Sequence, residues 1–342
     1  MEPLLEQART ARQELLSRLE SLEPPLDREA ISALLSRESL GTAAIEGELL
    51  DPAQVRSSIA QRLRLPLTEG HPTASAQVEG LLDVLMEATS SLEAPLSLAT
   101  LNHWHQRLFV AGPDGLRAIR IGVLRDEAPM QVLSGVIGRE RLHFEATPRN
   151  QLERQLEVFL DWIASPPAEL DGLLRAGLAH LWFLTLHPYE DGNGRLARAI
   201  TDRLLAQDSR ASVQQGLSAR ALGISAQISL SWFLEQLTAE AVTNGAVIDA
   251  VRRKAAFWWS HRYSGFNNRQ QKLLNRLLDA EPEGFMGGMT LRKAISLTKV
   301  SRATAWRDLS ELVEQQAIEP IGEGRSRAYR IHWPSASEPL AL

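Results

Sequence analysis

The chain has 342 residues, of which 44% are hydrophobic and 23% charged, the balance of a globular protein long enough for two or three domains. It contains no cysteine, which excludes a disulfide scaffold, a Cys-ligated zinc site and a thiol nucleophile. The net charge of −5 is uneven, because residues 251–330 carry +7 and the remainder carries −12. We expect the acidic body and the basic C-terminal module to meet different partners, although a solvated basic face alone would give the same balance.

Two features of the sequence bear on location. No apolar run approaches the ~18–20 residues that a membrane helix needs. The start of the chain, Met1 to Glu6, lacks the basic segment and apolar block of a signal peptide. We therefore expect no membrane association and a cytoplasmic location.

Residues 1–110 have the pattern of helices, with leucine and alanine recurring every three or four residues. Pro24 and Pro25 separate a first helix from a second pattern that begins after Asp27, and a third run covers residues 76–92. Residues 130–145 read as a short β-hairpin with a glycine-containing turn. Helices are predicted again over 152–163, 173–185, 196–206 and 229–262.

The C-terminal region has a different order of elements. Helical patterns over 268–279, 291–297 and 302–314 precede two short strands, 317–321 and 327–333, that flank a glycine-rich turn. Three helices followed by a two-stranded ribbon is the order of a winged helix. The sequence therefore predicts a mainly α protein with an N-terminal helical region (1–95), a helical core domain that carries the hairpin (96–245) and a winged-helix domain (246–342).

One segment combines residue types that suit phosphate chemistry, namely residues 187–198, His-Pro-Tyr-Glu-Asp-Gly-Asn-Gly-Arg-Leu-Ala-Arg. Pro188 ends the preceding helix, and Gly192 and Gly194 permit a tight turn that exposes backbone N–H groups. N–H groups at the start of the next helix favour an anion. Arg195 and Arg198 are three residues apart, so they share a helix face and can flank the same phosphates.

Two further side chains of this segment complete a catalytic site. Asp191 offers a hard oxygen ligand for the Mg²⁺ that accompanies a nucleotide, and His187 can accept a proton near neutral pH. An ordinary helix–loop–helix turn is the alternative. The pattern GxxxxGK[S/T] does not occur, so this is not a Walker loop.

The segment resembles the motif HPFx[D/E]GNGRxxR of the Fic family, with Tyr189 where phenylalanine is usual, and a looser likeness extends over residues 40–240. The resemblance implies a Fic-type helical core that transfers AMP from ATP to a Ser, Thr or Tyr hydroxyl of a protein and releases pyrophosphate. It also implies the roles of the segment: His187 as general base, Asp191 as ligand of Mg²⁺, Gly192, Asn193 and Gly194 as anion hole, Arg195 on the β-phosphate and Arg198 on the γ-phosphate.

A second match lies upstream, where residues 42–47, Thr-Ala-Ala-Ile-Glu-Gly, resemble the family's inhibitory motif [S/T]xxxE[G/N]. The resemblance implies that Glu46, with Thr42 at the start of the motif, pairs with Arg198 and blocks the seating of the γ-phosphate. A carboxylate on Arg198 would compete with phosphate for the guanidinium. The alternative is a helix that simply ends at Gly47 and leaves Glu46 exposed.

The resemblance implies that the hairpin 130–145 is the family's flap, on which a target segment would lie as an added strand, clamped by Met130, Val132 and Leu133. A plain scaffold hairpin is the alternative. Fic relatives usually have a tyrosine pair after the motif that contacts the base, whereas this chain has no tyrosine between 199 and 262. A different nucleotide donor, or the reverse reaction (deAMPylation), therefore stays open.

The predicted winged helix places residues 301–307 at its recognition-type helix, with Ser301 as N-cap and with Arg302 and Thr304 facing DNA. Arg325 and Arg327 would lie on the wing. A protein-docking or dimerisation module is the alternative use of this scaffold. The expected partners are thus a protein substrate, a second copy of the chain and, in a rival interpretation as a nucleotide-sensing regulator, DNA.

Overall fold

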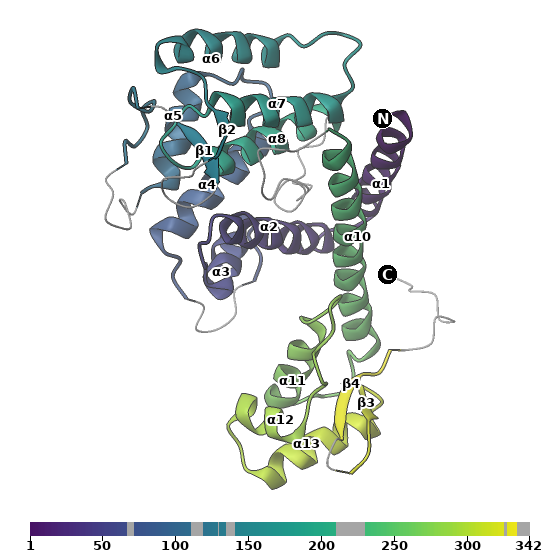
Figure 1. The fold of residues 1–342 in the computed structure, drawn as a ribbon. Coiled ribbons are helices and arrows are strands. Elements are labelled where there is room, and N and C mark those ends of the chain that lie inside the picture. Colours follow the sequence, from purple (N-terminus) through teal and green to yellow (C-terminus); the bar gives the residue numbers. More distant parts are fainter. Residues whose placement is uncertain are drawn as a thin grey trace. The chain divides into compact units, whose positions relative to one another are not determined.

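The structure is a computed structural model that describes residues 1–66, 72–110, 119–128, 130–134, 141–209, 230–324 and 327–333. It is mainly helical, which confirms the fold class predicted from the apolar periodicity (Figure 1). The chain divides into two compact units, Met1–Gly245 and Ala246–Leu342. The elements of the first unit are α1 (Glu2–Glu20), α2 (Leu26–Ile45), α3 (Pro52–Arg62), α4 (Ala76–Ser90), α5 (Leu98–Leu108), β1 (Gln131–Ser134), β2 (Arg141–Glu145), α6 (Arg149–Ala164), α7 (Gly172–Leu186), α8 (Asn193–Ser209) and the first half of α10 (Leu230–Ser260).

The centre of the first unit is the pair α7 and α8, which lie side by side with α4, α5 and α6 around them (Figure 1). Every residue of α8 from Arg195 to Ala206 is buried. Large side chains such as Trp104, Phe159 and Phe183 are fully buried in this layer, and each contributes about 1.5–3 kcal/mol through removal from water. The start of α8 is therefore held in a fixed place by its packing.

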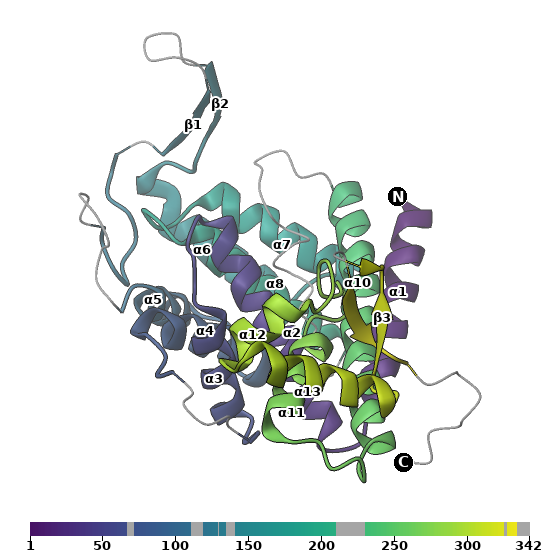
Figure 2. The same ribbon diagram turned by 90° about the horizontal axis from the view of Figure 1, so that it is seen from below.

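The strands β1 and β2 form an antiparallel hairpin that projects from the helices (Figure 2). Gln131 pairs with Glu145, and the register shifts between Val132 and Leu133. Residues 135–140, which contain the predicted turn, lie outside the described residues.

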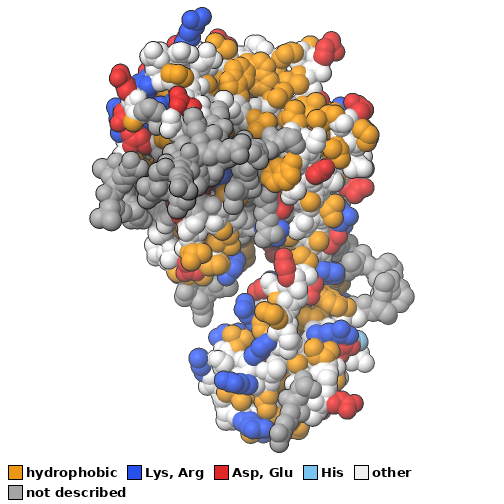
Figure 3. Space-filling view, viewed as in Figure 1, with side chains coloured by type: hydrophobic (Ala, Val, Ile, Leu, Met, Phe, Trp, Pro, Cys, Tyr) orange, Lys and Arg blue, Asp and Glu red, His pale blue; other side chains and the backbone are white. Residues whose placement is uncertain are grey.

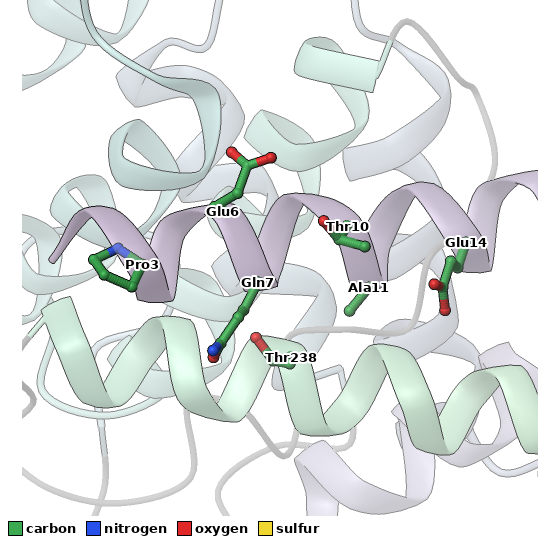
Figure 4. A pocket seen from close by; sticks show the side chains of 7 residues that line it. All are labelled: Pro3, Glu6, Gln7, Thr10, Ala11, Glu14 and Thr238. Carbon is green, nitrogen blue, oxygen red and sulfur yellow. The ribbon is translucent and has the colours of Figure 1, made fainter.

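A shallow cavity of about 470 Å³ lies between α1 and α10. It is lined by polar and small side chains of α1, with Gln7 pointing toward Thr238 of α10 (Figure 4). None of its lining residues belongs to the segments that the sequence singles out.

The second unit contains the rest of α10, then α11 (Asn268–Leu278), α12 (Leu291–Thr298), α13 (Arg302–Glu314), β3 (Ile318–Ile321) and β4 (Ala328–Ile331). The strands pair antiparallel with Ile318 opposite Ile331. Their buried faces pack on α11 and α13 in one core that includes Leu273, Leu309 and Leu312. This is the predicted winged-helix-like order of three helices and a hairpin.

No helix among the described residues combines the length and the hydropathy that a membrane span requires.

Candidate functional site

His187 lies directly after α7 in a left-handed backbone conformation, with φ 48° and ψ 60°. Its backbone N–H donates to the carbonyl of Phe183 at 3.0 Å and so closes the last turn of the helix. Pro188 cannot continue the helix, so the chain turns away here. Burial lowers the pKa of the His187 imidazole below its ordinary value, and the ring is therefore neutral at pH 7 and able to accept a proton.

The backbone around His187 is held by Arg125, whose side chain is buried. The Arg125 Nε donates to the carbonyl of His187 at 2.8 Å, and the Arg125 backbone N–H donates to the carbonyl of Pro188 at 2.9 Å. The same guanidinium also donates to the carbonyl of Thr147. Sequence reasoning missed this clamp, because Arg125 is 62 residues from His187 and belongs to no motif.

Within the loop, Asn193 fixes the shape through its side chain. Its Oδ1 accepts from the backbone N–H of Tyr189 at 3.0 Å, and its Nδ2 donates to the carbonyl of Tyr189 at 2.7 Å. Tyr189 is fully buried and donates its hydroxyl to Asn102 at 2.8 Å. The predicted anion hole therefore depends on backbone N–H groups, since the amide of Asn193 is engaged inside the loop.

His105 is a second residue that sequence reasoning missed. It stacks on Tyr189 with 4.3 Å between ring centroids. Its Nδ1 lies 2.9 Å from the donating N–H of Gly122, and its Nε2 lies 3.1 Å from the carbonyl of Asp191. These partners assign the proton to Nε2. Burial lowers the pKa of His105 to about 4, so the ring is neutral and anchors the loop at Asp191.

Asp191 is exposed just before α8, and its Oδ1 accepts from the N–H of Gly192 at 2.6 Å. In the described ranges, no group of three or more His, Asp or Glu side chains is placed to hold a metal ion. Mg²⁺ commonly takes one or two carboxylates together with substrate phosphates. An exposed hard oxygen donor beside an anion-binding helix start fits that mode.

Near the start of α8, Arg198 is 2% exposed and contacts Thr42 of α2 and Glu46, the residue after α2. Its Nε donates to the hydroxyl of Thr42 at 2.6 Å, and its Nη2 donates to Glu46 Oε1 at 2.5 Å. A Cβ on Gly194 would lie only 2.6 Å from the same Glu46 oxygen. The Glu46 carboxylate thus lies directly beside Gly194, in the first turn of α8.

Arg195 is also paired with a carboxylate, which the sequence analysis did not predict. Its Nη1 donates to Glu48 Oε1 at 2.8 Å, and its guanidinium lies 4.8 Å from the ring centroid of Phe109. The Arg195 Nε is buried without a hydrogen-bond partner among the described residues. Both arginines of the segment therefore face acidic residues that follow α2.

The end of α2 explains how two glutamates reach this place. The N–H of Glu48 donates to the carbonyl of Ala43 at 2.9 Å, and the N–H of Gly47 donates to the carbonyl of Ala44 at 3.1 Å. Gly47 has φ +77°. This is a Schellman motif, in which a left-handed glycine closes the helix and reverses the chain. The helix α2 therefore ends at Ile45 and is closed by Gly47, close to what the alternative interpretation held, and Glu46 is nevertheless paired.

The predicted flap residues are only partly described. The carbonyl of Met130 accepts from the N–H of Ala146 at 2.9 Å, whereas the side chains of Val132 and Leu133 lie outside the described residues. Residues 210–229, in the span without tyrosine, also lie outside them.

Three family matches cover separate parts of the chain. Residues 1–65 match a domain of unknown function, DUF4172, residues 95–205 match the Fic/DOC family, and residues 285–332 match the C-terminal domain of DIP2311-like transcriptional regulators. A 64-residue stretch is 38% identical to a protein adenylyltransferase Fic from Nematostella vectensis, a match that spans 18% of this chain and 15% of that relative.

Solved structures are similar over larger parts of the chain. A Fic-domain signaling protein from Bacteroides thetaiotaomicron is 19% identical with a TM-score of 0.50, over 72% of this chain and 97% of the other. A Fic family protein from Desulfovibrio desulfuricans is 20% identical with a TM-score of 0.47, over 97% and 96%. The likeness to the Bacteroides thetaiotaomicron structure concerns the fold alone. The family match covers the loop 187–193 together with Arg195 and Arg198. Residues 95–205 of this chain therefore form a domain of the Fic/DOC family.

Proposed function

We propose that the chain is an autoinhibited protein adenylyltransferase, which transfers AMP from ATP to a Ser, Thr or Tyr hydroxyl of another protein. One observation carries the proposal. A neutral, backbone-clamped His187 precedes the loop that leads into α8, and two buried arginines follow it in α8, inside the part of the chain that matches the Fic/DOC family.

In this reaction His187 takes the proton of the target hydroxyl while its oxygen attacks the α-phosphorus. The new O–P bond forms as the bond from the α-phosphorus to the bridging oxygen breaks, and pyrophosphate leaves with those electrons. The proton then passes from His187 to solvent. The lowered pKa of His187 keeps the imidazole ready as a base.

The other end of the loop would hold the departing phosphates. Arg195, Arg198 and the N–H groups that open α8 stabilise their charge by position and electrostatics, as phosphoryl transfer requires. Asp191 would hold Mg²⁺, which when bound supplies further charge neutralisation to the phosphates.

The same geometry supports a closed resting state. The Glu46 carboxylate lies on Gly194 and on Arg198, so a phosphate group would have to displace it and would be repelled by its charge. Thr42 holds Arg198 in the orientation that faces Glu46. We expect the natural signal for activation to move Glu46 away.

The test compares wild type, Glu46→Gly and the double variant Glu46→Gly/His187→Ala, each incubated with α-labelled ATP, Mg²⁺ and a cell lysate. Label on protein should rise in the single variant, and it should fall on the order of 100-fold from that level in the double variant, since general-base catalysis contributes about 10²–10⁴-fold.

Absence of labelled protein in all three incubations would contradict the proposed adenylyltransferase activity. A panel of labelled nucleotide donors, and of AMP-modified proteins for the reverse reaction, would then identify the activity, because the span after the motif lacks tyrosine.

A second function is favoured for the C-terminal unit, namely binding of duplex DNA through α13. Trp306 is 59% exposed on this helix, and Arg302 and Arg307 are exposed beside it, while Ala305 and Leu309 are buried in the core. Ser301 caps the helix by accepting from the N–H of Thr304 at 3.2 Å. Arg327 of the hairpin is exposed, Arg325 lies outside the described residues, and Lys and Arg side chains spread over the visible face of this unit (Figure 3).

Fluorescence anisotropy with a labelled 30-bp duplex tests this second function. The logarithm of the binding constant should fall linearly with the logarithm of the salt concentration. The variant Arg302→Ala/Arg307→Ala should have a lower affinity and a shallower slope. Equal anisotropy with and without protein at low salt would contradict this second function.

A further inference from the structure

Glu48 is placed to act on the phosphate site although it lies outside the inhibitory motif of residues 42–47. Its Oε1 accepts from Arg195 Nη1 at 2.8 Å. The Arg195 side chain is 5% exposed and that of Glu48 is 28% exposed. Glu46 pairs with the other arginine, Arg198, at 2.5 Å. Each arginine of the segment therefore has its own carboxylate.

The turn at Gly47 creates this arrangement. The Schellman motif reverses the chain at one left-handed residue, so that the glutamates before and after it both reach α8. Arg195 and Arg198 are three residues apart and share a helix face. Two acidic groups separated by one residue thus meet two guanidinium groups separated by one helical turn.

A diphosphate presents the same chemistry, namely two adjacent anionic groups, to a helix start and two arginines. We propose that residues 46–48 are an internal mimic of a diphosphate and that Glu48 is a second inhibitory carboxylate, which competes for the phosphate that binds Arg195. The identity of the nucleotide rests on the proposed function, whereas the competition at Arg195 does not.

Glu48 is held less completely than a phosphate would be. It uses one nitrogen of Arg195, and the buried Nε of that guanidinium has no hydrogen-bond partner among the described residues. A phosphate has more acceptor oxygens than the single contact uses. Removal of Glu46 alone therefore leaves Arg195 occupied, and full opening of the site requires that both carboxylates move.

Isothermal titration calorimetry with inorganic pyrophosphate tests the proposal on the full chain. The proteins are wild type, Glu46→Gln, Glu48→Gln and the double variant, since glutamine keeps the shape of the side chain and removes its charge. Each single variant should bind pyrophosphate on the order of tenfold more tightly than wild type, and the double variant more tightly than either, as expected for coupled sites.

Two further proteins control the measurement. Glu319→Gln removes a carboxylate that pairs with Arg330 at 2.5 Å on the C-terminal hairpin, and its pyrophosphate affinity should equal that of wild type. Glu48→Asp keeps the charge on a shorter side chain and should give an intermediate affinity. It also carries the test if Glu48→Gln does not fold.

Two outcomes overturn the proposal. In the first, Glu48→Gln leaves the pyrophosphate affinity unchanged, both relative to wild type and when it is added to Glu46→Gln. In the second, none of the variants binds pyrophosphate. Label transfer from ATP is measured separately on the same proteins. If Glu48→Gln binds pyrophosphate more tightly while no variant transfers AMP, the role of Glu48 as a second inhibitory carboxylate is supported and the adenylyltransferase activity is contradicted. If Glu46→Gln raises AMP transfer while Glu48→Gln changes neither transfer nor pyrophosphate binding, the adenylyltransferase is supported and the second inhibitory carboxylate is contradicted.

Discussion

The two ends of the loop 187–193 are held in place by different kinds of contact. At the His187 end, Arg125 donates to the backbone carbonyls of His187 and Thr147. At the α8 end, Arg195 and Arg198 are held by the carboxylates of Glu48 and Glu46, whose side chains are 28% and 25% exposed. His187 is therefore held through its backbone, whereas the arginines are held by side-chain carboxylates, which an anion can replace.

Removal of the Arg125 clamp should give the largest effect. The variant Arg125→Ala removes the guanidinium donor from the carbonyls of His187 and Thr147, at a cost of about 1–3 kcal/mol for each carbonyl in the free energy of unfolding. A displacement of His187 of about 1 Å should lower AMP transfer in the Glu46→Gly background on the order of 100-fold. Urea denaturation and single-turnover labelling measure the two effects.

Arg175→Ala is the matched control, because Arg175 also donates to a backbone carbonyl, that of Ile163 at 2.6 Å, away from the loop. It should lose stability but keep transfer. If both variants lost transfer equally at a temperature where they are folded, the clamp would have only a structural role.

Acid should weaken the anchoring of the loop at Asp191, which depends on neutral His105. Its pKa is lowered to about 4 in the folded chain from an ordinary value of 6.5, so the unfolded chain binds the proton first as pH falls. Stability is therefore lost between about pH 6.5 and 4, by on the order of 1.4 kcal/mol per pH unit from this group. Denaturation of wild type and His105→Gln at several pH values measures it, and an equal pH dependence of the two proteins would contradict the prediction.

The turn that aims the two carboxylates can be strained without a clash. Gly47 has φ +77°, and a Cβ there would meet no atom within 4 Å, so Gly47→Ala should cost about 1–2 kcal/mol through the backbone alone. It should also raise pyrophosphate affinity, because the strain favours release of residues 46–48. Gly265→Ala, at φ +64° and equally open, should cost as much stability with no change in affinity.

The smallest effect is expected at Tyr189. Replacement by phenylalanine, the usual family residue, removes the hydroxyl that donates to Asn102 at 2.8 Å. The loss of this bond should cost about 1 kcal/mol and leave transfer unchanged, since the ring still stacks on His105. A clear fall in transfer at full stability would show that the hydroxyl acts in the reaction.

The sequence alone determined the features that depend on neighbours along the chain. The leucine and alanine periodicity predicted the helices, because burial on one helix face follows from spacing. Pro188 and Gly192 predicted the turn before α8, because they restrict or free the local backbone. The same expectation was wrong for Gly194, which lies inside α8. The partnership of Glu46 with Arg198 came from matching two family motifs, and the structure places these two side chains in contact.

Only the tertiary structure decided which distant residues hold the loop. His105, Arg125 and Glu48 are 86, 62 and 147 residues from their partners Asp191, His187 and Arg195. A buried guanidinium or a neutral imidazole at such a separation depends on the packing of α5 and of the segments beside α7 and α8. That packing leaves no periodic or motif signal along the chain, because it is a property of surfaces that meet only after folding.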